Sequence, residues 1–465
     1  MPSTPDSFVA HPRYTAEFAR ARALLFAHPG RWRVIYHYDG DGIASASAAA
    51  RALARLGYPV QTTPLLGVER DRIEPLVRAT HGPLLVVDTG ASWLDLFATH
   101  GHPVIVLDHH QYPQSEAAAS TLPAHVALVN PLDWGVDGMS ELSAATLTWL
   151  FTIFLDPVNW DNAPWGLSGA IADRQHVGGF RGLNRRLVEE ASARSFVQVR
   201  RGLAFFGPTL GEALTASIDP YLAGVSGRPA AVAELLHGLG LDPDRPPELL
   251  DAAERDRLAQ AIRSRLARQA VAPEVLEAVA HDRYYLPALG KDAEELANLQ
   301  NAAGRAGEPS IGIAVALGDP GALARAAQHE ASWRAGILEG LRRIETEGVK
   351  SLEALQWFVS GETTLAGTQA GLAMTYLLDP NRPVFVFSNG DGRVKVSARA
   401  THRLVAQGLD LAAAVREAAS SVGGEGGGHR IASGATIPAG REEEFRRLAN
   451  ARIAEQLGVA RGPTG

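Results

Sequence analysis

Residues 33–42 read RVIYHYDGDG, in which a β-branched apolar run leads directly into a histidine, two aspartates and two glycines. The run predicts a buried strand, and the alanine-rich segment 43–56 predicts a helix after it. Apolar runs recur at 84–88 (LLVVD), 104–108 (VIVLD) and 126–130 (VALVN). Alternating strands and helices indicate an α/β fold with a parallel sheet, in which the carboxyl ends of the strands share one edge.

The rest of the chain divides into two further regions. Helical patterns and proline-rich joints dominate up to about residue 348, and this predicts a helical connecting or insertion region. Strand and helix patterns then return together and predict a smaller α/β domain. We therefore predict a catalytic domain at 1–185, a helical connecting region at 186–348 and a smaller α/β domain at 349–465.

The composition excludes several classes of protein. Cysteine is absent from all 465 residues, so any metal must be held by His, Asp, Glu or Asn. A net charge of −7 argues against a globally basic nucleic-acid-coating protein but leaves room for a local basic groove. No stretch reaches the roughly 18 apolar residues that span a bilayer, and residues 1–10 do not resemble a signal peptide. We expect a cytoplasmic protein without a membrane partner.

Acidic and imidazole side chains follow three successive predicted strands. The polar residues after any one strand could simply form a turn, a helix N-cap or a solvated loop. For the metal-site interpretation to be wrong, such an explanation would have to apply at all three strands. Because the strand ends meet at one edge, we expect one metal-binding crevice there. The glycines at 40 and 42 would allow the first turn. The candidate residues are His37, Asp39, Asp41, Asp88, Asp108, His109 and His110.

Asp173 is a further candidate ligand, in the apolar helical stretch 165–175 (WGLSGAIADRQ). A carboxylate that faces a core is costly unless it is paired or bound to a metal. The alternative is that Asp173 faces solvent together with Arg174, and the periodicity of the stretch does not decide between the two.

Two segments near the C-terminus could bind phosphate. The run 423–429 (GGEGGGH) is either a flexible linker or a set of free backbone N–H groups that cradles an anion. Lys395, Ser397 and Arg399 alternate with apolar residues and therefore share one strand face. That face is either simply exposed or binds substrate, in which case Arg399 could hold a phosphate with two hydrogen bonds.

The motifs HYDGDG, VVDTG, LDHHQ and IADRQ occur in the order of the four metal-binding motifs of the DHH phosphoesterase family, which the chain resembles. The resemblance implies two divalent cations, with manganese preferred and magnesium as the alternative. His110 would contact the phosphoryl group and Asp108 would support the histidine pair. One cation would be held by His37, Asp39, Asp88 and Asp173, and the other by Asp41, Asp88, His109 and Asp173.

The C-terminal motifs also resemble this family. The GGGH motif is similar to that of the DHH-associated C-terminal domain, which implies substrate binding by Gly426, Gly427, Gly428 and His429 together with Lys395, Ser397 and Arg399. The segment 291–305 resembles archaeal-type RecJ-like proteins. Arginines between 181 and 201 could follow a phosphate backbone or could form a solvated helix face.

These resemblances imply a two-metal phosphodiesterase that acts on single-stranded DNA or RNA, or on short oligonucleotides. A first alternative is a small-nucleotide phosphoesterase, acting on cyclic dinucleotides or on 3′-phosphoadenosine 5′-phosphate. A second is a catalytically silent nucleic-acid scaffold. Scaffolds of this fold usually lose metal ligands, whereas all the candidate ligands are present here.

Overall fold

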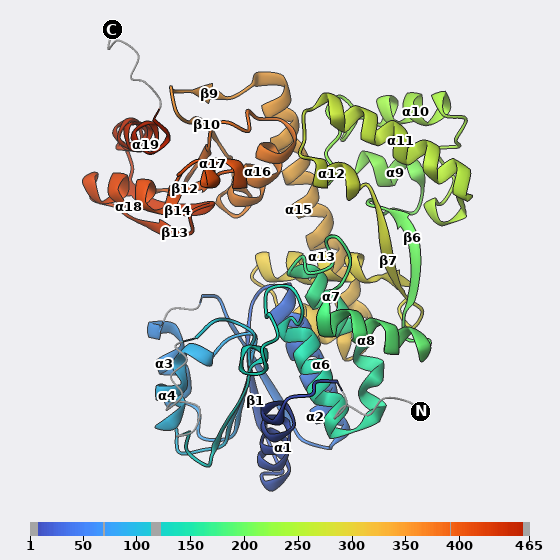
Figure 1. The fold of residues 1–465 in the computed structure, drawn as a ribbon, viewed down its shortest axis with the longest axis vertical. Coiled ribbons are helices and arrows are strands. Elements are labelled where there is room, and N and C mark those ends of the chain that lie inside the picture. The colour runs from blue at the N-terminus through green and yellow to red at the C-terminus, as the bar shows by residue number, and fades with distance from the viewer. Residues whose placement is uncertain (1–7, 68–69, 113–121, 391, 459–465) are drawn as a thin grey trace. The chain divides into compact units, whose positions relative to one another are not determined.

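The computed structural model describes residues 8–67, 70–112, 122–390 and 392–458. The chain forms two compact units (Figure 1). The first contains Met1–Arg201 and His281–Ala331, and the second contains Gly202–Ala280 and Ser332–Gly465. Both units mix helices with a sheet, which confirms the predicted α/β fold class. The outer limits of the predicted domains, residues 1 and 465, lie outside the described residues.

The first unit is built on a five-stranded sheet with the order β2-β1-β3-β4-β5. All neighbouring strands in this sheet are parallel, so their carboxyl ends meet at one edge as predicted. The edge strand β2 was missed by the sequence analysis, because its residues VQTTPL are mostly half-exposed and form no apolar run. The strands are β1 (Trp32–His37), β2 (Val60–Leu65), β3 (Leu84–Val87), β4 (Val104–Leu107) and β5 (Val126–Val129).

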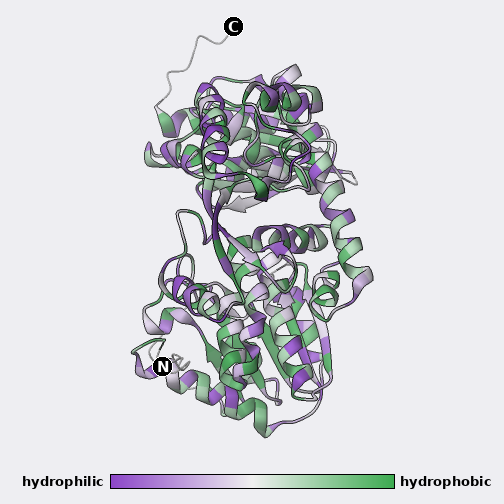
Figure 2. Ribbon diagram, turned by 90° about the vertical axis from the view of Figure 1, so that its right-hand side faces the viewer, coloured by the Kyte–Doolittle hydropathy of each residue, from purple (hydrophilic) through white to green (hydrophobic). Residues whose placement is uncertain are grey.

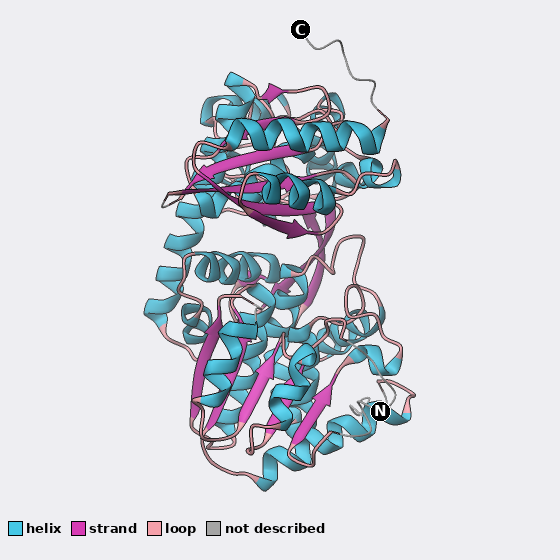
Figure 3. Ribbon diagram, turned by 90° about the vertical axis from the view of Figure 1, so that its left-hand side faces the viewer, coloured by secondary structure: helices cyan, strands magenta, loops and turns pink. Residues whose placement is uncertain are grey.

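Helices cover both faces of this sheet, and hydrophobic residues concentrate along its strands (Figures 2 and 3). Alternate residues of each strand face opposite cores, so Val34 and Leu85 pack on one side while Ile35 and Leu84 pack on the other. Full burial of each such side chain contributes roughly 1.5–3 kcal/mol. One core includes α1 (Pro12–Ala27), α2 (Gly40–Arg55), α6 (Ala144–Leu155) and α7 (Ala163–Ala172), and the other includes α3 (Arg70–Arg78), η2 (Ala91–Trp93) and α4 (Leu94–Ala98).

Helix α2 begins at Gly40, three residues earlier than predicted. The Asp-Gly-Asp-Gly segment is therefore the first helical turn rather than a separate loop, and Asp39 caps it by accepting a hydrogen bond from the Gly42 N–H at 3.1 Å. Glycine is required here for close packing. A Cβ on Gly42 would lie 2.1 Å from the His37 carbonyl oxygen, and a Cβ on Gly40 would lie 2.6 Å from Cβ of Ala172.

The predicted helical connecting region is divided between the two units and also contains strands. The sequence analysis did not predict these strands, which form a three-stranded sheet of order β6-β7-β8. Charged and polar residues interrupt their sequences QVRRGL, AHDRYYL and KD, so the apolar pattern of a buried strand is missing. The strands are β6 (Gln198–Leu203), β7 (Ala280–Leu286) and β8 (Lys291–Asp292). The further helices of the first unit are η3 (Pro131–Trp134), η4 (Pro157–Asn162), α8 (Gly182–Ala193), α13 (Ala293–Arg305) and α14 (Ser310–Ala316), and α15 (Pro320–Glu347) contains the boundary at residue 331.

The second unit contains a six-stranded mixed sheet of order β13-β14-β12-β11-β10-β9. Its strands are β9 (Lys350–Ser351), β10 (Gln356–Val359), β11 (Val384–Asn389), β12 (Arg393–Arg399), β13 (Glu425–Gly428) and β14 (Ala432–Pro438). Helices α16 (Thr363–Tyr376), α17 (His402–Ala406), α18 (Leu411–Ser421) and α19 (Glu442–Leu457) belong to the same fold. Its other part is helical, with α9 (Leu210–Thr215), α10 (Pro229–Gly238), η5 (Pro247–Leu249), α11 (Ala252–Arg268) and α12 (Pro273–Glu277). Among the described residues, no helix combines the length and apolar character needed to cross a membrane.

Candidate metal centre

The carboxyl edge of the parallel sheet gathers three overlapping groups of potential metal ligands. His37, Asp39 and Asp88 form the first group, and Asp41, His109 and Asp173 form the second. Asp88, His109 and His110 form the third, which shares members with the other two. Within each group the three ligand atoms lie within 4.8 Å of one another. The structure thus brings together all six side chains that the sequence analysis selected as metal ligands.

Short distances between side-chain atoms connect the first two of these groups. His37 Nδ1 lies 2.9 Å from Asp39 Oδ2 and 3.7 Å from Asp88 Oδ2. The other oxygen of Asp88, Oδ1, lies 3.3 Å from His109 Nε2. Nε2 of His109 is in turn 3.6 Å from Asp173 Oδ2 and 3.8 Å from Asp41 Oδ2. Asp88 therefore lies between the groups, with one oxygen directed to each.

The backbone of Asp88 is unusual in a way that serves this position. Its φ angle is +59°, in the left-handed region that side chains other than asparagine and aspartate rarely adopt. The residue directly follows β3 and its side chain is only 2% exposed. Strained backbone of this kind persists where the surrounding structure requires it, and it is common at functional sites.

Asp41 is held by the N-terminus of helix α6. Its Oδ2 accepts a hydrogen bond from the Ala144 N–H at 2.8 Å, and its Oδ1 accepts from the Ala145 N–H at 2.9 Å and the Ser143 hydroxyl at 3.0 Å. Ser143 is also the N-cap of α6, where its side chain accepts a hydrogen bond from the Thr146 N–H. The positive end of the helix dipole favours the ionised carboxylate at this site.

A chain of hydrogen bonds orients His109. Its Nδ1 lies 2.7 Å from the Gly138 carbonyl oxygen, which leaves Nε2 directed at the carboxylates. The same carbonyl accepts a hydrogen bond from Gln175 Nε2 at 2.9 Å, and Asn184 Nδ2 donates to Gln175 Oε1 at 2.6 Å. Supporting contacts of this type set the ring orientation of metal-binding histidines.

Asp108 supports His110 rather than contacting a ligand group directly. Its Oδ1 accepts hydrogen bonds from His110 Nδ1 at 2.8 Å and from the His110 N–H at 3.2 Å, while Oδ2 accepts from the Ala91 N–H at 2.9 Å. Asn130 Nδ2 donates to the His110 carbonyl oxygen at 3.1 Å. The His110 side chain is 52% exposed, so an anchored imidazole remains accessible at the edge of the centre.

The crowding of acids shifts their ionisation. Burial and the charges of Asp39 and Asp41 raise the pKa of Asp88 well above its usual value, and burial with the charge of Asp41 raises the pKa of Asp173 to about 8. Burial would also raise the pKa of Asp39, but its hydrogen bond and charge interaction with His37 lower it to about 2. The carboxylates thus repel one another strongly, and cations would relieve that repulsion.

Helix α13 contributes to the centre, and sequence reasoning did not assign it this role. Asn301 Oδ1 accepts a hydrogen bond from the Gly40 N–H at 3.0 Å, and Arg305 interacts electrostatically with Tyr38 and Asp39. In the sequence, only the RecJ-like character of segment 291–305 pointed to a functional role for this helix. Gly138 carried no signal, because a contact through a backbone carbonyl leaves no residue pattern. Gln175 lies in the IADRQ motif, but the motif did not indicate its contact with Gly138.

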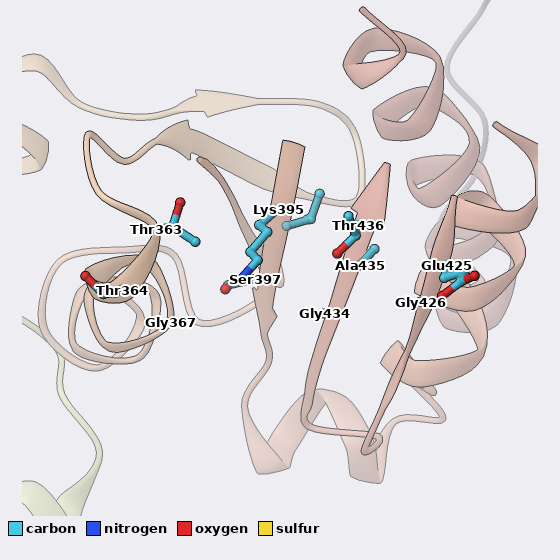
Figure 4. Close-up of a pocket in the computed structure, with 11 residues that line it drawn as sticks. Thr363, Thr364, Gly367, Lys395, Ser397, Glu425, Gly426, Gly434, Ala435 and Thr436 are labelled. Atoms are coloured by element: carbon cyan, nitrogen blue, oxygen red, sulfur yellow. The ribbon is translucent and has the colours of Figure 1, made fainter. Parts of the chain in front are cut away.

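The second unit contains a cavity of about 710 Å³ (Figure 4). Lys395 and Ser397 line it from β12, where the expected alternation holds because Val394, Val396 and Ala398 point into the core. The remaining lining residues are Thr363, Thr364, Gly367, Val396, Glu425, Gly426, Gly434, Ala435 and Thr436. The cavity therefore offers hydroxyl groups, one lysine and backbone, opposed by a single carboxylate.

Of the other predicted substrate residues, Gly426 lines this cavity, whereas Arg399, Gly427, Gly428 and His429 are not among its lining residues. Gly427 and Gly428 continue the edge strand β13, so the glycine run is a strand rather than a linker. His429 is exposed in the turn between β13 and β14. Arg399 is largely buried, and a Cβ on Gly367 would lie 3.2 Å from its Nη2, which places the guanidinium beside the cavity wall.

The arginines between 181 and 201 mostly have partners within the first unit. These contacts favour the interpretation as a structural helix face over a free phosphate track. The pairs are Arg185 with Glu189, Arg186 with Phe8, Arg194 with Glu190 and Trp160, Arg200 with Tyr285, and Arg201 with Asp282.

The fold and the clustered acids and histidines indicate a metal-dependent phosphoesterase, which is a hydrolase. Residues 31–166 match the N-terminal domain of the DHH family, and residues 356–455 match the DHHA1 domain. The chain belongs to the DHH family, as its motifs predicted. An uncharacterized protein of Methanocaldococcus jannaschii is 27% identical over 438 residues, which cover 93% of this chain and 95% of that protein.

Solved structures share the fold. The exonuclease RecJ bound to manganese has a TM-score of 0.59 at 20% identity, with 96% of each chain covered. RecJ from Thermus thermophilus in complex with Mn²⁺ has a TM-score of 0.57 at 19% identity, covering 97% of this chain but 56% of that one. CDC45 from Entamoeba histolytica has a TM-score of 0.65 at 9% identity, covering 98% of this chain and 100% of that one.

Proposed function

We propose that the chain hydrolyses phosphodiester bonds in single-stranded DNA or RNA, or in short oligonucleotides, with two divalent cations of which manganese is preferred. One observation carries the proposal. His37, Asp39 and Asp88 converge as one group and Asp41, His109 and Asp173 as another, with Asp88 only 3.3 Å from His109. RecJ, which shares the fold, is described as an exonuclease and was crystallised with manganese.

The residues fit a pair of hard divalent cations. Carboxylate oxygens and imidazole nitrogens without sulfur suit manganese and magnesium. Burial and mutual repulsion raise the pKa of Asp88, Asp41 and Asp173, and these are the groups that opposite charge would stabilise in the ionised form. When bound, such cations polarise phosphoryl oxygens and lower the pKa of a water molecule.

The surrounding residues have positioning roles in this proposal. The α6 N-terminus orients Asp41, and the Gly138 carbonyl keeps Nε2 of His109 directed at the carboxylates. His110, held by Asp108, contacts the phosphoryl group from its exposed position and donates a hydrogen bond to it. Hydrogen bonding to Asp108 raises the pKa of His110, and the charged imidazole would stabilise negative charge on phosphate oxygens.

The cavity of the second unit supports substrate binding and also favours a second candidate function. Its volume of about 710 Å³ lies within the range of small-molecule sites, roughly 300–1,000 Å³. Such a cavity could hold one nucleotide of a longer strand. It could equally hold a small nucleotide substrate such as a cyclic dinucleotide or 3′-phosphoadenosine 5′-phosphate.

The decisive experiment compares substrates on metal-defined protein. The full chain is stripped with a chelator, reloaded with manganese or magnesium, and incubated with labelled single-stranded DNA and RNA of several lengths and with both small nucleotides. We expect cleavage of the oligonucleotides that requires added cation. Turnover of the small nucleotides alone would replace the nuclease proposal with the second candidate. Binding of oligonucleotides without any turnover would instead indicate a scaffold.

A further inference from the structure

A further group of potential metal-binding side chains lies in the first unit and shares no residue with the three groups at the sheet edge. His176, His281 and Glu294 each offer one ligand atom, and these atoms lie within 4.8 Å of one another. They come from the loop after α7, from strand β7 and from the first turn of α13. All three residues lie outside the segments that match the DHH and DHHA1 domains.

Both imidazoles approach the same carboxylate oxygen. Nε2 of His281 lies 2.6 Å from Glu294 Oε1, and Nε2 of His176 lies 3.4 Å from it. With bonds of about 2.0–2.1 Å, two ligands of a four-coordinate zinc ion are about 3.3–3.4 Å apart. The contact of His176 already has this separation, and His281 needs to move by less than about 1 Å to reach it.

The donor set matches a particular class of cation. Two histidines and one glutamate without sulfur form a ligand set that zinc uses in proteins, with a fourth position left to water. The side chains of His176, His281 and Glu294 are 15%, 24% and 11% exposed, so the group is enclosed yet can be reached from solvent.

The surrounding charges permit a cation. Arg283 is a nearby positive group, but its Nη2 lies 3.0 Å from Asp292 Oδ2, and this ion pair offsets its charge locally. Glu294 is an acidic residue, and a glutamate carboxylate is ordinarily ionised at neutral pH. One net negative charge therefore remains beside two imidazoles that are good ligands when neutral.

We propose that His176, His281 and Glu294 bind one zinc-type divalent cation that is distinct from the catalytic pair. The cation would link two segments whose hydrogen bonds support the metal centre at the sheet edge. His176 directly follows Gln175, which donates to the Gly138 carbonyl that orients His109. Glu294 begins the helix whose Asn301 accepts the Gly40 N–H.

The test counts zinc in the purified full chain. Wild-type protein is stripped, reloaded with zinc, dialysed, and analysed by inductively coupled plasma mass spectrometry. We expect His281→Ala to hold one zinc ion fewer per chain than wild type. The matched control is His329→Ala, which removes a His–Glu contact of 3.2 Å with Glu308 that belongs to no three-ligand group among the described residues. This control should keep the wild-type zinc content.

Two more variants separate loss of this zinc ion from misfolding and from loss of the sheet-edge metal centre. Glu294→Gln keeps a hydrogen-bond acceptor for the imidazoles but removes the carboxylate, so it should stay folded by circular dichroism and lose the same single zinc ion. Asp88→Asn should lose zinc from the sheet-edge centre and retain this one. Equal zinc content in wild type, His281→Ala and Glu294→Gln would overturn the proposal, and the group would then be only hydrogen-bonded. Loss of the same ion in Asp88→Asn would also overturn it.

Discussion

The metal centre and the cavity of the second unit are constructed in contrasting ways. Asp41 and Asp88 in the metal centre have side chains that are at most 2% exposed, and they repel one another across a few ångströms. The cavity is lined by hydroxyl groups and backbone of a mixed sheet and its neighbouring helix, with Lys395 as its one lysine. The first region needs added positive charge, whereas the second already offers donors to an anion.

This difference assigns separable roles to the two regions. Buried carboxylates that converge on one point are costly unless cations neutralise them, so the first region is defined by the chemistry it performs. A surface of hydroxyls, amides and one lysine gains energy by holding phosphate in substrate and transition state alike, which affects binding more than turnover. Variants in the two regions should therefore separate kcat from KM.

Asp88→Ala should have the largest effect, a loss of turnover of roughly 10³-fold or more, because both ligand groups lose their shared carboxylate. The measurement is manganese-dependent hydrolysis of the best substrate, with circular dichroism to verify folding. Asp95→Ala is the matched control, since that aspartate is 63% exposed and forms an ion pair with Arg70 at 2.8 Å. Unchanged activity of Asp88→Ala would remove the metal centre from the reaction.

Gln175→Ala should weaken manganese binding about 10–100-fold, because the Gly138 carbonyl that orients His109 loses its hydrogen-bond donor. Manganese titration of activity measures this shift, and saturating metal should restore much of the rate. Gln198→Ala, on the exposed strand β6, should behave like wild type. An unchanged manganese requirement in Gln175→Ala would show that the supporting hydrogen bonds do not matter.

Lys395→Ala should raise KM about 10-fold and leave kcat within a few-fold, because in the proposed function the lysine side chain binds substrate phosphate without taking part in the reaction. Steady-state kinetics measure both constants. Lys350→Ala removes a lysine that lies over the Trp357 ring elsewhere in the same unit and should change neither constant. A fall in kcat alone would contradict the separation of roles between the two regions.

Glu17 offers a smaller test of buried acids outside the metal centre. Burial raises its pKa to about 8, although it accepts a hydrogen bond from Trp134 Nε1 at 2.8 Å. Unfolding returns the pKa to near 4.5, so the folded chain binds more protons between about pH 4.5 and 8, and stability falls as pH rises through this window. Glu17→Gln should remove this fall.

The expected difference between Glu17→Gln and wild type is on the order of a few kcal/mol above pH 8 and near zero below pH 4.5. Denaturant unfolding followed by tryptophan fluorescence at several pH values measures it. An equal pH dependence in both proteins would mean that Glu17 is ionised in the folded chain, and burial alone would then be a poor guide to the charge state of the metal-centre acids.

The sequence by itself determined the elements whose signals are local. Apolar runs ending in Asp or His predicted β1, β3 and β4, and parallel topology then placed their ends at one edge, which brought five of the six expected ligands together. The sixth, Asp173, follows helix α7, and the sequence left its orientation open. Alternation along residues 394–398 likewise predicted which side of β12 is exposed. These signals are readable because strand periodicity and burial act on residues adjacent in the chain.

Tertiary structure decided the supports and the boundaries. Strand β2 lacks an apolar run, and the start of α2 at Gly40 depends on close packing against His37 and Ala172. The contacts of Gly138 with His109, and of Asn301 with Gly40, join segments far apart in the sequence. In a hydrogen bond between a side chain and a backbone group, only the residue that supplies the side chain must be of a particular type. No local sequence pattern therefore marks the backbone partner, which is selected by packing across the folded chain.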